Sequence, residues 1–239
     1  MRTGTSLVGN ILTVHPKIQV FSEKVHFFRF VYNKYDPMDI ENAERALRHM
    51  QLRWRYRFGI ALDVDTIMGN LIAKELSYGV VYEEIMRCLC NRTDAEIWTE
   101  NVAVQWRYIP QFLNMFPNGK AIHIYRDIRG VLASWREMTF SPNNQFLNAI
   151  FNWVDSINCM QRYKDILCSS RYLPVRFEDI HADPQSTCQR ICTFLGIEFE
   201  ALMLEPERWA ESFNKDFVEA NTSSHTRKKV YGFDSKRGE

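Results

Sequence analysis

Residues 121–134 read Ala-Ile-His-Ile-Tyr-Arg-Asp-Ile-Arg-Gly-Val-Leu-Ala-Ser. The first five residues form a short apolar run, which predicts a buried strand, and a helix is predicted from Val131 onward. A second short strand is predicted at 172–177, and amphipathic helices separate the two. This alternation predicts an α/β fold in three layers, with a central parallel sheet covered by helices on both faces. Ligands of such folds bind just beyond the carboxyl ends of the strands, where Arg126 lies.

The predicted helices are amphipathic, with apolar residues at helical spacing. The segment 39–54 places Ile40, Ala43, Leu47, Met50 and Trp54 on one face. The other helices are predicted at 3–12 (after a turn), 66–75, 80–89, 104–116, 144–168 and 184–195.

Composition limits the possible classes of function. The chain has 239 residues, enough for one large domain, and 30 basic residues against 29 acidic ones, so a nucleic-acid partner is not expected. No apolar run is long enough to cross a bilayer, and no signal peptide is recognised. The cysteine and histidine spacings form no zinc pattern, so we expect no metal, and we expect reduced cysteines in a cytoplasmic protein.

The segment Arg2-Thr3-Gly4-Thr5-Ser6-Leu7 places a glycine and hydroxyl side chains at a helix start. Successive backbone N–H groups there can bind a phosphate, helped by the helix dipole and Arg2. The alternative is an ordinary helix N-cap at Thr5 or Ser6. The segment is not a Walker A loop. A strand is expected before such a turn, so the sheet lacks its first strand, and we expect the chain to be truncated at both ends.

Arg126 follows the strand 121–125, and Ser134 lies eight residues further on, in the next helix. An arginine fork and a hydroxyl in this arrangement can converge on one phosphate. The alternative is an exposed Arg-Asp-x-Arg turn with no ligand.

Together these motifs resemble those of the PAPS-dependent sulfotransferase family, with the tyrosyl-protein and bacterial sulfotransferases nearest in pattern. The segment Leu173-Pro-Val-Arg-Phe-Glu-Asp-Ile180, then Asp183-Pro184 and Phe194-Leu-Gly-Ile197, resembles the family's later strand and helix. The resemblance covers residues 2–200. It implies one domain, 1–239, of P-loop-like topology, with a helical segment at 33–97 that binds the acceptor.

The resemblance also implies PAPS as sulfo donor, PAP as product and a hydroxyl acceptor, which is a carbohydrate, a peptide or a small molecule. Arg2 would act in catalysis, holding the 5′-phosphate together with Thr3, Gly4, Thr5 and Ser6. Arg126 and Ser134 would hold the 3′-phosphate.

Three further residues are assigned by the same resemblance. Phe177 falls where relatives stack an aromatic ring on adenine, although core packing explains a strand-end aromatic equally. Glu23 falls at the spacing of a catalytic base, the alternative being a solvated carboxylate beside Lys24. Asn101 replaces a lysine of the relatives and brings no charge.

Two other classes of function remain open from the sequence. One is a non-catalytic nucleotide-binding relative, suggested by Asn101. The other is a P-loop kinase using ATP, against which the absent Walker lysine argues. The alternating basic and aromatic residues at 52–58 suit either an acceptor-binding wall or a helix end covered by arginine stems. The sequence does not determine the acceptor or the oligomeric state.

Overall fold

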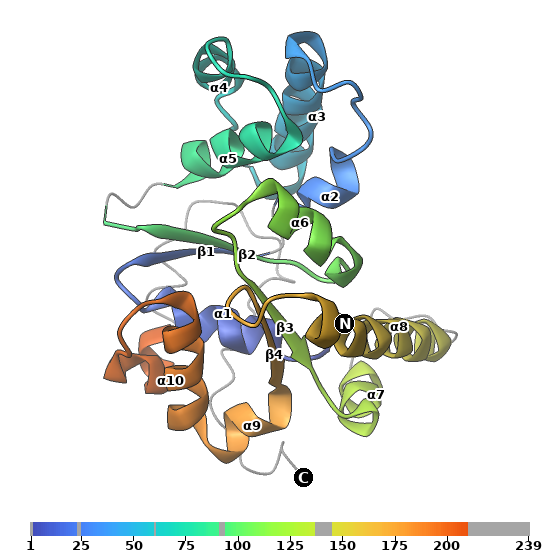
Figure 1. Ribbon diagram of the computed structural model, residues 1–239, viewed down its shortest axis with the longest axis vertical. Coiled ribbons are helices and arrows are strands. Elements are labelled where there is room, and N and C mark those ends of the chain that lie inside the picture. Colours follow the sequence, from blue (N-terminus) through green and yellow to red (C-terminus); the bar gives the residue numbers. More distant parts are fainter. Residues whose placement is uncertain (1, 23–24, 60, 91–93, 137–144, 210–239) are drawn as a thin grey trace.

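A computed structural model describes residues 2–22, 25–59, 61–90, 94–136 and 145–209 (Figure 1). The first half of the fold comprises α1 (Thr5–Thr13), β1 (Ile18–Ser22), α2 (Phe27–Phe30), α3 (Ile40–Phe58), α4 (Val64–Leu71), α5 (Tyr78–Leu89) and β2 (Ile97–Asn101). The second half comprises a 3₁₀ turn, η1 (Trp106–Tyr108), then α6 (Ile109–Met115), β3 (Ala121–Tyr125), α7 (Ile128–Arg136), α8 (Gln145–Ile166), β4 (Tyr172–Arg176), α9 (Phe177–Ala182), α10 (Pro184–Leu195) and η2 (Ala201–Leu204).

The strands form two parallel pairs, β1 with β2 and β3 with β4. The mixed α/β class and the parallel direction are therefore confirmed, as are the predicted strands β3 and β4. The strands β1 and β2 were not predicted from the sequence, because Gln19 interrupts the apolar run of β1. Its amide is nevertheless buried, and its Oε1 accepts a hydrogen bond from Cys90 Sγ at 2.9 Å.

Two apolar clusters hold the fold together. One joins α1, β1, β3, β4, α9 and α10, and includes the buried Cys188 and Cys192 as small apolar side chains. The other joins α2, α3, α4 and α5, which lie together at one end of the molecule beyond the β1–β2 pair (Figure 1). The helices α3 to α5 lie within the predicted segment 33–97. No helix in the described ranges is long and apolar enough to span a membrane.

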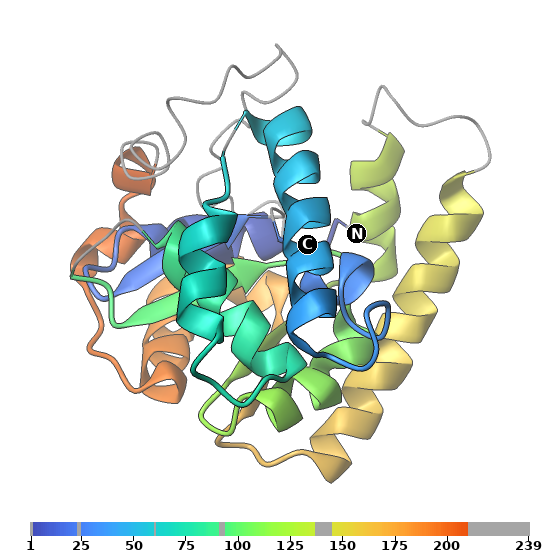
Figure 2. The same ribbon diagram turned by 90° about the horizontal axis from the view of Figure 1, so that it is seen from above.

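The helix α3 follows its predicted amphipathic pattern and lies beside α4 when the molecule is viewed from above (Figure 2). Asp39 caps it by accepting a hydrogen bond from Asn42 N at 2.8 Å. Ala43, Leu47, Met50 and Trp54 are buried as predicted. Ile40, the first residue of the predicted stripe, is 43% exposed and so does not share in this burial.

A cavity of about 1060 Å³ lies between the two strand pairs. The strands β2 and β3 line it on opposite sides, and residues of α1, α5 and α6 line it as well. Within the described ranges no backbone hydrogen bond joins β2 to β3. The sheet is thus divided at its centre.

Candidate functional site

The turn before α1 and the helix α7 meet through Arg2 and Ser134, which are 132 residues apart in the sequence. Arg2 Nε donates a hydrogen bond to Ser134 Oγ at 2.8 Å. Arg126 Nη1 donates a longer hydrogen bond, 3.4 Å, to the Arg2 carbonyl oxygen. The fold therefore brings the two predicted phosphate-binding motifs together.

Gly4 shapes the turn in two ways. Its φ of 95° lies in the left-handed region, and a Cβ at this position would lie 2.1 Å from Phe177 Cδ2. Gly4 is also the N-cap of α1, and no side chain caps that helix. The alternative of a capping Thr5 or Ser6 is therefore wrong, because both residues lie inside the helix. The first N–H groups of α1 and the positive end of its dipole lie at this turn.

The side chain of Arg126 is packed against Phe177 and close to Gly130. Its guanidinium carbon lies 4.1 Å from the centre of the Phe177 ring. A Cβ at Gly130 would come within 2.7 Å of Arg126 Nε, so a larger residue at 130 would require the guanidinium to move. Trp153 Nε1 donates to the Arg126 carbonyl oxygen at 2.7 Å and ties this residue to α8. Such fixation lowers the entropy lost when an arginine binds an anion.

Phe177 is more deeply buried than a ring that stacks on a bound ligand needs to be. The residue is 5% exposed, with the Arg126 guanidinium over its ring and the His181 ring centroid 4.6 Å away. The position matches the core-packing alternative. Stacking on adenine stays a prediction, and it requires Arg126 to turn away from the ring.

The acidic residues near Arg126 are paired with other arginines. Arg129 binds both carboxylate oxygens of Asp127, and its hydrogen bonds lower the pKa of that carboxyl. Glu178 accepts from Arg176 Nε at 3.1 Å and from Asp127 N at 2.9 Å. These pairings limit the negative potential beside Arg2 and Arg126, which favours binding of an anion.

A second polar network lies at the carboxyl end of β2 and was not foreseen from the sequence. Glu100 accepts hydrogen bonds from the Tyr82 hydroxyl and from His26 N, the latter at 2.7 Å. The buried side chains of His26 and Gln105 are 2.9 Å apart, Nδ1 to Nε2. Burial raises the pKa of Glu100. A lone Glu in a strand carries no signal that could have identified this network.

Glu23, the predicted base, lies outside the described residues, as does Lys24. The network nevertheless fixes the chain directly after them, because Glu100 binds the backbone of His26, which has a φ of 51°. A non-glycine residue in this conformation is strained, and the hydrogen bond helps to hold it.

Asn101 lies against α1. A Cβ at Gly9 would approach the Asn101 amide nitrogen to 3.4 Å, which places that amide beside the second turn of the helix. Arg107, a cation in the predicted helix 104–116, binds Asp155 through two hydrogen bonds of 2.7 and 2.8 Å. This pairing raises the pKa of Arg107 and holds its charge at α8.

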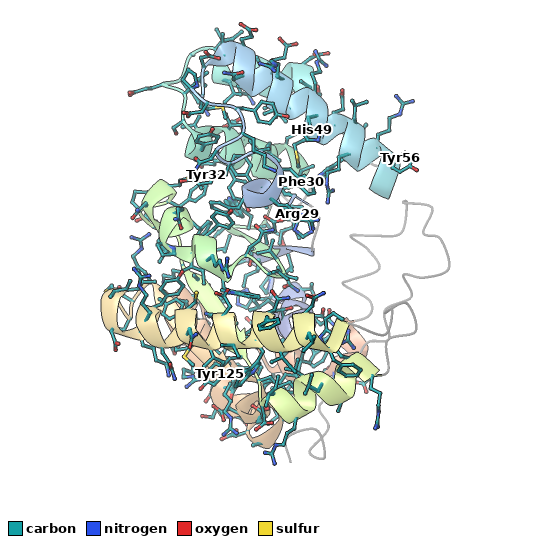
Figure 3. All side chains as sticks on the ribbon, turned by 90° about the vertical axis from the view of Figure 1, so that its right-hand side faces the viewer. Arg29, Phe30, Tyr32, His49, Tyr56 and Tyr125 are labelled. Carbon is teal, nitrogen blue, oxygen red and sulfur yellow. The ribbon has the colours of Figure 1, made fainter. Side chains whose placement is uncertain are left out.

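The basic and aromatic residues at 52–58 do not form one wall, because a helix turns alternate residues to different sides. Trp54 is buried, whereas Tyr56 is 96% exposed. The Arg53 guanidinium carbon lies 4.1 Å from the centre of the Phe30 ring, as expected for an arginine that covers a helix end. Phe30, Arg29 and His49 lie close together, whereas Tyr56 extends outward from the end of α3 (Figure 3).

Comparisons with known proteins agree with this architecture. The model of a sulfotransferase family matches residues 1–201, and the chain belongs to that family. A search of curated proteins found no match. Among solved structures, the sulfotransferase domain from the Synechococcus PCC 7002 olefin synthase is similar, with 18% identity and a TM-score of 0.63 over 99% of this chain and 82% of that one. The sulfotransferase domain from the curacin biosynthetic pathway has 18% identity and a TM-score of 0.54 over 86% of this chain and 74% of that one. At this identity the likeness shows the fold.

Proposed function

We propose that the chain transfers a sulfo group from PAPS to a hydroxyl acceptor and releases PAP. The observation that carries this proposal is the hydrogen bond of 2.8 Å between Arg2 and Ser134, which joins the two anion-binding motifs at one site. A donor with phosphates at both its 5′ and 3′ positions needs two such motifs side by side. ATP has no 3′-phosphate for Arg126 and Ser134 to bind.

The roles of the residues follow from their positions and charges. Arg2 and the first N–H groups of α1, at Gly4, Thr5 and Ser6, bind the 5′-phosphate, with Thr3 completing the turn. Arg126 and Ser134 bind the 3′-phosphate. Charge grows on the oxygen between sulfur and the 5′-phosphate as their bond breaks, and Arg2 stabilises that charge.

In the proposed transfer step, Glu23 acts as the general base. The acceptor oxygen forms a bond to sulfur, the bond between sulfur and the bridging oxygen breaks, and PAP leaves with the bonding electron pair. The proton of the acceptor hydroxyl passes to the Glu23 carboxylate. As in phosphoryl transfer, the protein chiefly positions the reactants and stabilises charge. No metal ion is required for these roles, and the six free cysteines support a cytoplasmic location.

The test is release of PAP from PAPS in the presence of sugar, lipid, phenol and peptide hydroxyls, with sulfated product identified by mass. We expect PAP to raise the melting temperature and ATP not to do so. Tight PAP binding without turnover on any acceptor would instead support a non-catalytic nucleotide-binding relative. Stabilisation by ATP together with phosphorylated product would support a kinase.

A further inference from the structure

The ring of Phe177 lies against both of the predicted phosphate-binding motifs. Its face carries the guanidinium of Arg126, whose central carbon is 4.1 Å from the ring centre. Its edge lies at the turn before α1, because a Cβ placed on Gly4 would overlap the ring atoms Cδ2 and Cε2. One side chain therefore fills the space between the arginine predicted to bind the 3′-phosphate and the turn predicted to bind the 5′-phosphate.

The parallel pairing of β3 and β4, which lie side by side in Figure 1, brings these residues together. Tyr125 and Arg176 are partners in the register, and they are the last residues of the two strands. Arg126 follows the first strand directly and Phe177 follows the second, so both stand at the same edge of the sheet. The contact between Arg126 and Phe177 is therefore a consequence of strand register and not of a local motif.

The ring is held more firmly than the direct hydrogen bonds between the motifs. Phe177 is buried, and the ring of the buried His181 packs against it in an edge arrangement with the centroids 4.6 Å apart. By contrast, the hydrogen bonds from Arg2 to Ser134 and from Arg126 to Arg2 are exposed, so water can replace them. Close packing in a core constrains geometry more than contacts that exchange with water. The ring is therefore suited to fix the distance between the two motifs.

We propose that Phe177 is a positioning residue that sets the spacing of the two phosphate motifs, and thereby the preference for a 3′,5′-bisphosphate. This inference rests on the proposed function, because it takes Arg126 as the residue that binds the 3′-phosphate. The ribose holds the two phosphates of such a nucleotide at a set distance, which the guanidinium and the turn at Gly4 have to match. A phosphate on the 2′ oxygen lies elsewhere, so a ring that fixes Arg126 selects against it. Stacking of adenine on the ring is the alternative, which the same experiment tests.

The test compares the binding of three nucleotides to the full chain: PAP, which is adenosine 3′,5′-bisphosphate, its 2′,5′ isomer and adenosine 5′-phosphate. Phe177→Met removes the ring and fills the space with a flexible apolar side chain. We expect calorimetry to show PAP binding weakened by about tenfold and the other two nucleotides by less than about threefold, as for loss of a partly buried cation–π contact. The preference of wild type for PAP over the isomer should therefore fall in the variant.

Two control variants separate positioning from a general loss of stability. Phe177→Tyr keeps the ring and should keep the preference for PAP over the isomer. Ile191→Ala removes a buried side chain of the same apolar cluster, on α10, so it should lower the melting temperature without changing that preference. Phe177→Leu, measured in the same way, replaces Phe177→Met if the latter does not fold.

Each outcome of this experiment has a separate meaning. An unchanged preference for PAP in the variants without the ring would overturn the inference and leave the proposed function intact. An equal loss of affinity for all three nucleotides would assign the ring to adenine stacking and would also overturn the inference. If wild type binds PAP no better than the other two nucleotides, the proposed function itself is wrong, and so is the positioning role that rests on it.

Discussion

The carboxyl ends of β2 and β3 lie on the two sides of the central cavity and carry opposite charges in different surroundings. At the end of β2, the carboxylate of Glu100 accepts hydrogen bonds from the Tyr82 hydroxyl and from the His26 backbone. Directly after β3, the half-buried Arg126 lies against Phe177 and beside the exposed Arg2. The comparison teaches that a charge bound by donors of the protein, as Glu100 is, serves to position the backbone. A charge that remains near water is available to a ligand.

The largest effect is expected at Glu23, the predicted base. Glu23→Gln keeps the shape of the side chain but cannot accept the acceptor's proton. Loss of a general base lowers kcat by about a hundredfold to ten-thousandfold. We expect unchanged PAP affinity, because the carboxylate acts on the acceptor. Steady-state rates at saturating acceptor, with calorimetry of PAP binding, measure both quantities, and near-normal rates would assign the base to another residue.

On the basic side, Arg126→Ala should weaken PAP binding by about 10- to 100-fold, because a hydrogen bond to a charged group contributes about 1.5–3 kcal/mol. Analogues without the 3′-phosphate should lose much less. Arg126→Lys should restore binding only partly, since lysine cannot form the fork. The matched control is Arg129→Ala, whose guanidinium is exposed and already paired with Asp127. Calorimetry that shows equal losses for both ligands would contradict the assignment of Arg126 to the 3′-phosphate.

A smaller effect is expected from placing a cation at the end of β2. Asn101→Lys should raise turnover at saturating PAPS by about fivefold. This factor corresponds to the difference of about 1 kcal/mol between the free energies of a neutral and a charged hydrogen bond. PAPS affinity should change little, because the charge acts chiefly in the transition state. The Asn101 amide lies beside Gly9 of α1, so a lysine has to extend toward the turn at Gly4. If turnover does not change, position 101 does not reach the bridging oxygen.

The smallest effect concerns stability and pH. The pKa of Glu100 is raised by burial, so the folded state binds this proton more tightly than the unfolded state, whose ordinary pKa is 4.5. The contribution of Glu100 to stability is therefore fully present below pH 4.5 and is lost as the pH rises through the folded pKa. Glu100→Gln keeps the shape of the side chain without the charge. The free energy of unfolding of this variant should therefore increase relative to that of wild type as the pH rises.

Urea unfolding of both proteins from pH 4 to pH 8 measures this difference, since the other carboxylates contribute equally to each. Glu83→Gln is the matched control, because Glu83 lies on the same helix as Tyr82 but pairs with Arg87 at the surface. A constant difference between wild type and Glu100→Gln across this range would show that Glu100 does not titrate differently on folding.

The local pattern of the sequence was sufficient to predict much of the fold. The predicted strand at 121–125 and helix at 184–195 coincide with β3 and α10, and Asp183 and Gly196 cap the two ends of that helix. The family also followed from the order of short motifs along the chain. The strands β1 and β2 were missed, since the polar residues Gln19 and Glu100 stand in them and are hydrogen-bonded by side chains of other elements, Cys90 and Tyr82.

The sequence by itself therefore determined the α/β class and the family, and it predicted the residues that bind phosphate. Each depends on a local pattern of apolar spacing, glycine and arginine. Only the tertiary structure decided that Arg2 meets Ser134, that Phe177 packs under Arg126 and that Glu100 holds the chain at His26. It also revealed the cavity between β2 and β3. These features depend on contacts between segments that are far apart in the chain, and burial and pKa arise only when such segments pack together.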